Sequence, residues 1–156
     1  MLRPVFLALL ALGLAACRSE PAGPSPEQQA VFAQAVDAEV VVASAPNDMR
    51  YATARVEAPA GATVRLVMDN SGTSSPAMLH NVVVLRAAGA VDRVGRAAAG
   101  DADHVPNDPA VIAATPLAGP GERTAVVFTV PPAGEYPFIC TYPGHYAYMQ
   151  GVLVSR

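Results

Sequence analysis

Short runs of alternating apolar and polar residues recur along most of the chain from about residue 39 onward. Residues 124–130, for example, place Val126, Phe128 and Val130 on one face. Alternation with a period of two is typical of a half-buried β-strand. We expect further strands at residues 39–43, 51–57, 63–68, 80–85, 111–113, 135–140 and 151–154. Seven or eight short strands at this spacing predict an all-β sandwich.

A Pro-Ala-Gly turn at residues 59–61 separates the runs at 51–57 and 63–68. Two alternating runs joined by such a turn favour a β-hairpin, so we expect these two strands to pair. The run at residues 80–85 is continuously apolar from Val82 onward, which indicates a strand that is buried on both faces.

Two segments fit helices better than strands. Between residues 87 and 109, Val91 and Val94 suit one face of a short helix within an otherwise irregular insertion. Ser25 followed by Pro26 carries a helix-start signal, a cap and a first-turn proline. A disordered linker is the alternative interpretation of this second segment.

Residues 1–16 are typical of a secretory signal peptide. Arg3 supplies a positive charge, and the apolar run at residues 5–12 is too short to span a bilayer. The signal ends at Leu14-Ala15-Ala16-Cys17, which resembles the bacterial lipobox. We therefore expect cleavage before Cys17, a lipid on that cysteine, and an exported protein anchored to a membrane in the periplasm or its equivalent. An ordinary signal peptide with an unrelated cysteine is the alternative.

The rest of the chain divides into a tether at residues 17–36, rich in Pro, Ser and Gly at its start, and one domain at residues 37–156. Asp and Glu number 13 against 10 Arg and no Lys, which leaves no basic stripe for nucleic acid. Because Cys17 is assigned to lipid, Cys140 has no disulfide partner.

Cys140, His145 and Met149 offer a thiolate, an imidazole and a thioether within ten residues. Soft sulfur ligands combined with imidazole suit copper, whereas calcium and magnesium prefer hard oxygen ligands. Pro143-Gly144 bends the chain between the first two, so both side chains can turn toward one point. A second imidazole must come from elsewhere, and His80 is the obvious candidate. The alternative is that the cysteine and methionine are ordinary core residues.

These residues and their neighbours resemble the cupredoxins, the small blue-copper proteins, and most closely the azurins and auracyanins. The resemblance rests on Met78-Leu79-His80-Asn81, on the loop from Cys140 to His145, and on the gap of three residues before Met149. It implies a Greek-key β-sandwich with one copper per chain, cycling between Cu(I) and Cu(II) to carry single electrons.

The resemblance also assigns roles to individual residues. The copper ligands would be His80, Cys140 and His145 in the equatorial plane and Met149 as a weak axial ligand. Asn81 would join the two ligand loops, with its backbone N–H aimed at the sulfur of Cys140. Leu79 stands where azurins have a glycine whose carbonyl is a distant axial contact.

An apolar docking surface is implied around an exposed edge of His145. Its members would be Met78, Tyr142, Pro143 and Gly144. Such a surface permits brief docking of redox partner proteins, so no small-molecule substrate is expected.

Two other functions compete with electron transfer. A copper-delivery lipoprotein would use the same fold, but delivery sites are often rich in Met or His, and no such cluster occurs here. A copper enzyme would need further histidines and an open coordination position. Once His80 and His145 are assigned, His104 alone remains, so no catalysis is predicted.

Overall fold

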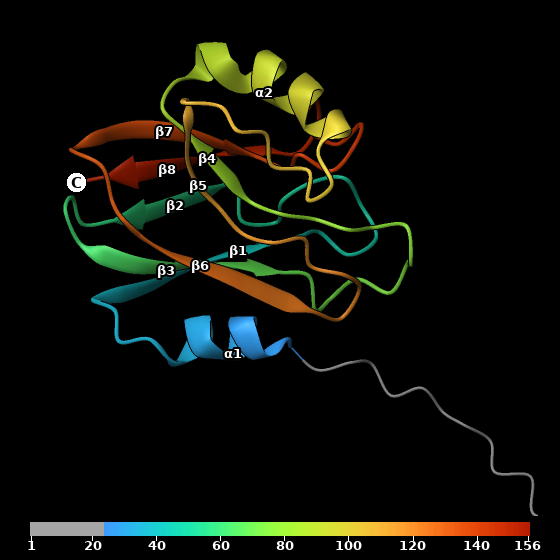
Figure 1. Ribbon diagram of the computed structural model, residues 1–156, viewed down its shortest axis with the longest axis horizontal. Helices are drawn as coiled ribbons and strands as arrows, with labels where there is room; N and C mark the ends of the chain where they lie inside the picture. The colour runs from blue at the N-terminus through green and yellow to red at the C-terminus, as the bar shows by residue number, and fades with distance from the viewer. Residues whose placement is uncertain (1–23) are drawn as a thin grey trace, which may run out of the picture.

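The computed structural model describes residues 24–156, which form a three-stranded and a five-stranded sheet packed face to face (Figure 1). The elements are α1 (Pro26–Ala33), β1 (Ala38–Ala43), β2 (Arg55–Ala58), β3 (Thr63–Asp69), β4 (Val83–Leu85), α2 (Val91–Ala97), β5 (Val111–Ala114), β6 (Arg123–Thr129), β7 (Gly134–Ile139) and β8 (Gln150–Ser155). The predicted all-β sandwich with a short helical insertion is therefore confirmed. The predicted signal peptide and Cys17 lie outside the described residues.

The sheets have the orders β1-β3-β6 and β2-β8-β7-β4-β5. Two pairs, β1 with β3 and β2 with β8, run parallel, and the other pairs are antiparallel. The predicted hairpin between the strands on either side of residues 59–61 is wrong, because β2 and β3 belong to different sheets. Alternation reports which face of a strand is buried, and both strands bury a face against the same core without pairing.

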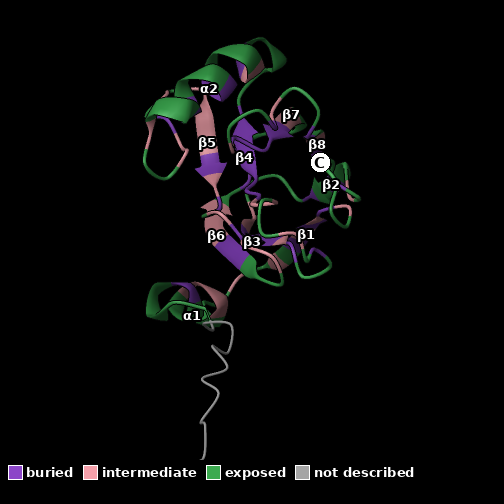
Figure 2. Ribbon diagram, turned by 90° about the vertical axis from the view of Figure 1, so that its right-hand side faces the viewer, coloured by how far each residue is buried: buried purple, intermediate pink, exposed green. Residues whose placement is uncertain are grey.

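The main core lies between the two sheets, where β3 contributes Leu66 and Met68 and β7 contributes Phe138. These side chains are at most 1% exposed, and the buried strands occupy the centre of Figure 2. A second, smaller cluster lies under α2 and includes Leu85 and Val94. Because the core covers one face of β4 and α2 the other, its continuous apolar run is buried on both faces as predicted.

Helix α1 lies beyond the three-stranded sheet, on the side of the molecule opposite to α2 (Figure 1). The hydroxyl of Ser25 accepts a hydrogen bond from the backbone N–H of Gln28, the cap that the sequence predicts. The buried residue of the helix is Gln28, whose amide donates to the carbonyl of Ala125 and accepts from its N–H. Among residues 24–156, no helix is long and apolar enough to cross a bilayer.

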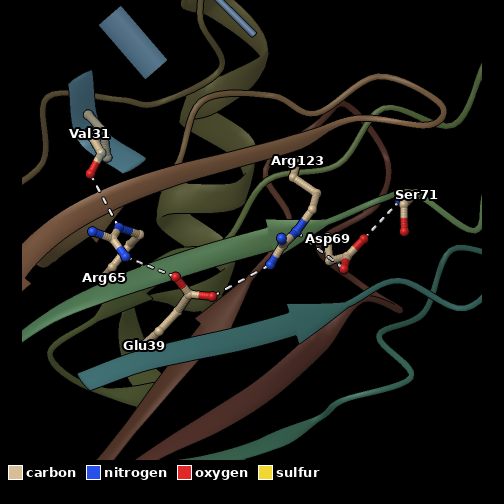
Figure 3. Close-up of polar contacts among 6 residues, drawn as sticks. All are labelled: Val31, Glu39, Arg65, Asp69, Ser71 and Arg123. Carbon is tan, nitrogen blue, oxygen red and sulfur yellow. Dashed lines mark hydrogen bonds and ion pairs between the residues drawn. The ribbon is translucent and has the colours of Figure 1, made fainter. Parts of the chain in front are cut away.

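The far end of α1 is tied to the sheet by Arg65, as Figure 3 shows. Its guanidinium donates to the carbonyl of Val31, 3.2 Å away, and to Glu39 on β1, 3.0 Å away. Glu39 also faces Arg123 on β6. The carboxylate of Glu39 thus pairs with Arg65 on β3 and with Arg123 on β6. These ion pairs link charged side chains on all three strands of the sheet.

Candidate metal centre

Strand pairing brings the predicted donor residues to one end of the sandwich. Cys140 directly follows β7, and Ile139 pairs with Val83 of the antiparallel neighbour β4. His80 precedes the first residue of β4 by three positions and sits in a β-bridge with Ala118 instead of in the longer strand that the sequence predicts. The end of β7 and the approach to β4 therefore lie side by side, which places Cys140 next to His80.

Three donor atoms converge in this place. The sulfur of Cys140 lies 3.9 Å from Nδ1 of His80 and 3.6 Å from Nδ1 of His145. All three donor atoms lie within 4.8 Å of one another, and the imidazole rings are 5.1 Å apart. The side chains are enclosed, since Cys140 and His80 are 0% exposed and His145 is 5% exposed. A thiol and two imidazoles around one point form a His2Cys set of the kind found in blue-copper sites.

Backbone hydrogen bonds hold the shape of the loop between β7 and β8. The N–H of Cys140 donates to the carbonyl of Met149, so both residues flank the base of the loop. Within it, the N–H of Met149 donates to His145 and that of His145 donates to Tyr142. Gly144 has φ +85°, a left-handed conformation that suits glycine and directs the turn before His145. The side chain of Met149 is fully buried at the loop end.

Burial keeps the three donors uncharged near neutral pH. It raises the pKa of the Cys140 thiol to about 11, although backbone N–H groups of Asn81 and Tyr142 favour the thiolate and oppose the rise. It lowers the pKa of His80 to about 4, with a further contribution from His145, and lowers the pKa of His145 as well. Neutral imidazoles are ready to bind a metal, whereas the thiol must first lose its proton.

Asn81 connects the two ligand loops. Its Oδ1 accepts from the backbone N–H of Thr141 at 2.8 Å, and its Nδ2 donates to the hydroxyl of the same residue at 2.9 Å. Residues beside His80 and Cys140 are thereby joined by a buried pair of bonds, which restricts movement of one loop relative to the other.

The predicted docking residues lie around His145, with Pro143 and Gly144 exposed and Met78 and Tyr142 half-buried. Leu79, beside His80, is also half-buried. The imidazole of His145 is less exposed than the sequence led us to expect. The ring of Tyr142 covers it edge-on with centroids 5.0 Å apart, and the ring of His104 packs on Tyr142 in turn at 5.5 Å.

The sequence pattern does not predict several of the residues that support the site. The hydroxyl of buried Tyr51 donates to the backbone carbonyl of Asn81 at 2.5 Å, and Thr141 donates to the carbonyl of His104. Burial, and then the charge of Cys140, raise the pKa of Tyr51 well above its ordinary value. Because every residue type has a backbone carbonyl, composition and spacing give no hint of these contacts.

The chain is similar to known copper-binding proteins. The model of the family "Copper binding proteins, plastocyanin/azurin family" matches residues 38–155. Auracyanin-A of Chloroflexus aurantiacus is 33% identical over 120 residues, which cover 74% of this chain and 72% of that protein. A solved structure of auracyanin A, described as a "blue" copper protein, has a TM-score of 0.69 at 32% identity, covering 76% of this chain and 98% of that chain.

Two further relatives extend the match. Azurin iso-2 of Methylomonas sp. is 36% identical over 115 residues, covering 69% of this chain and 89% of that protein. Outer membrane protein H.8 of Neisseria meningitidis is 33% identical, in a match that covers 94% of this chain and 95% of that protein. The chain therefore belongs to the plastocyanin/azurin family of copper-binding proteins.

Proposed function

We propose that this protein carries single electrons through one type 1 copper site. The supporting observation is that the buried sulfur of Cys140 lies close to the Nδ1 atoms of His80 and His145. Copper bound there supplies a Cu(I)/Cu(II) couple for one-electron exchange. The three donor side chains are at most 5% exposed, which favours a carrier over an enzyme, because a copper enzyme needs a coordination position open to its substrate.

The residues that would hold the copper are His80, Cys140 and His145, with the thioether of Met149 as a weaker fourth ligand. Cu(I) and Cu(II) prefer different geometries, so a site free to relax would rearrange at each transfer. The pairing of β4 with β7 and the bonds from Asn81 to Thr141 hold the ligand loops in one arrangement. A site held in this way needs little rearrangement when an electron arrives or leaves.

We propose that redox partner proteins dock on the surface formed by Met78, Tyr142, Pro143 and Gly144. Tyr142 is both partly exposed and in contact with the ring of His145, so it lies between the solvent and a ligand. Residues 140–149 contain no charged side chain, which suits short-lived apolar docking. Leu79, half-buried beside His80, would adjoin the proposed copper site.

We also propose that the protein is exported and attached to a membrane by a lipid on Cys17. The lipobox-like sequence supports this, and one relative that spans nearly the whole chain is named an outer membrane protein. Mass spectrometry of the mature N-terminus should find an acylated Cys17. A Cys17→Ser variant should accumulate in the membrane as uncleaved precursor, and release of an unmodified mature protein into solution would contradict the anchor.

Copper titration tests the function directly. The purified domain should bind one Cu(II), turn intensely blue, and show the small copper hyperfine splitting of a cysteine-bound type 1 site in its spin-resonance spectrum. Cys140→Ser should abolish the blue colour, whereas His104→Ala, which removes the third histidine, should leave it in place. A colourless adduct, more than one copper per chain, or rapid loss of copper to a mild chelator would contradict the proposal.

A further inference from the structure

Asn70, directly after β3, has a fully buried side chain that contacts three backbone carbonyls at once. Its Nδ2 lies 2.8 Å from the carbonyl oxygen of Met78, 3.0 Å from that of Ala118 and 3.1 Å from that of Gly119. Its Oδ1 accepts a hydrogen bond from the hydroxyl of Ser44 at 2.7 Å, which fixes the orientation of the amide. Both ends of the side chain are therefore satisfied.

The carbonyls that Asn70 reaches belong to the two segments that hold His80. Ala118 exchanges two backbone hydrogen bonds with His80, at 3.1 Å and 2.7 Å, and Met78 precedes His80 by two residues. The carbonyls of Ala118 and Gly119 each accept from a second backbone N–H. The carbonyl of Met78 has no second donor in the described part of the chain, so its place depends on Asn70.

His80 needs this support because its ring is not oriented by hydrogen bonding on its far side. Among residues 24–156, buried Nε2 of His80 has no hydrogen-bond partner, whereas its Nδ1 faces Cys140. The position of the ring is thus set by packing and by the backbone of residues 78–80. Asn70 fixes that backbone from one side and Ala118 fixes it from the other.

We propose that Asn70 is a positioning residue for the copper site, acting on His80 as Asn81 acts on the loop of Cys140. The inference rests on the copper site proposed above. It predicts that the amide donors of Asn70, beyond their part in stability, set how well His80 meets a metal. Partners that orient metal ligands in this way typically change metal affinity by about 10- to 100-fold when removed.

Asn70→Asp tests the proposal, because it keeps the shape of the side chain and replaces its donors with an oxygen facing carbonyl oxygens. The matched control is Gln28→Glu, which makes the same amide-to-acid change at a buried contact between α1 and Ala125 of β6, with no hydrogen bond to residues 78–80 or 118–119. Both variants should lower the urea midpoint of the copper-free protein. Asn70→Asp alone should weaken Cu(I) binding about 10-fold or more in competition with a chelator.

Two further readouts separate positioning from general stability. In proton NMR of the Cu(I) form, the ring signals of His80 should move in Asn70→Asp, while Gln28→Glu should match wild type. The reduction potential should shift in the first variant alone. If Asn70→Asp does not fold, Asn70→Ser, uncharged and too short to reach Met78, should show the same changes to a smaller degree.

The results that would overturn the inference differ from those that would overturn the copper site. If the wild-type protein gives no blue adduct, the proposed function fails. If the wild type is blue, the copper site stands. The proposed role of Asn70 then fails if Asn70→Asp or Asn70→Ser does not differ from Gln28→Glu in copper affinity, in the NMR signals of His80 and in reduction potential.

Discussion

At the scale of single residues, the thiol of Cys140, a proposed copper ligand, should control how copper binding depends on pH. Burial raises its pKa to about 11, so the thiol is protonated at pH 7 and must release one proton when a metal binds. The apparent copper affinity should therefore rise about tenfold per pH unit through the neutral range. Calorimetry in buffers of different ionisation enthalpy should count about one proton released per copper. A count near zero would mean that the thiolate already exists in the free protein.

His80 makes the copper-free protein sensitive to acid. Its pKa falls from 6.5 to about 4 on folding, so between these values the unfolded chain binds more protons than the folded one. The free energy of unfolding should therefore decrease as pH falls through this window, by up to about 3 kcal/mol. Urea titrations of the copper-free protein at pH 7 and pH 4.5 measure the loss. His80→Gln should show a smaller loss, and an equal loss in both proteins would exclude His80 as the cause.

At the scale of secondary-structure elements, α2 and the copper-binding loop meet at Gly95. A Cβ added there would lie 2.2 Å from the ring of Tyr146, the residue after His145. Gly95→Ala should therefore destabilise the protein by about 1–3 kcal/mol, although alanine favours an isolated helix by about 1 kcal/mol. Thermal unfolding measures the effect. The double variant Gly95→Ala/Tyr146→Ala should recover part of the loss, and a stabilising single variant would show that the ring moves freely aside.

The sequence predicted the strands but could not predict how they pair. The alternating runs at residues 63–68 and 124–130 correspond to β3 and β6 within one or two residues, because apolar alternation follows directly from burial of one face. The run at residues 80–85 was too long, since the N–H of Val82 donates to the side chain of Thr115 and leaves the ladder. A side-chain hydroxyl at that distance along the chain leaves no local pattern.

The donor set followed from the sequence because its chemistry depends on residue type, and a Cys, a His and a Met in one short loop already restrict the metal. Apart from the link that Asn81 makes to the loop of Cys140, the supporting contacts were not predicted. Asn70 lies in a stretch of Asn, Ser and Gly that looks like an ordinary loop, and its partners are carbonyls that every residue carries. Such contacts arise from the tertiary fold, so the sequence predicted that His80, Cys140 and His145 meet but not how they are held.

At the scale of the whole molecule, the amide of Gln28 has a consequence for association. β6 is an outer strand of its sheet, and the paired bonds from Gln28 to Ala125 occupy the positions that a neighbouring strand would use. An uncovered strand with free N–H and C=O groups is a template for pairing with another chain. Helix α1 therefore covers one pairing position on this edge strand.

A recombinant domain cut to residues 38–155, the part that matches the family, would lose helix α1 and with it the cover over Ala125. We expect it to form dimers or larger aggregates in a concentration-dependent manner, while a protein beginning at residue 24 stays monomeric. Light scattering after size-exclusion chromatography distinguishes the two, and a monomeric short domain would contradict the expectation. Residues 24–37, which supply none of the three converging donor atoms, would then decide whether the copper protein stays monomeric in solution.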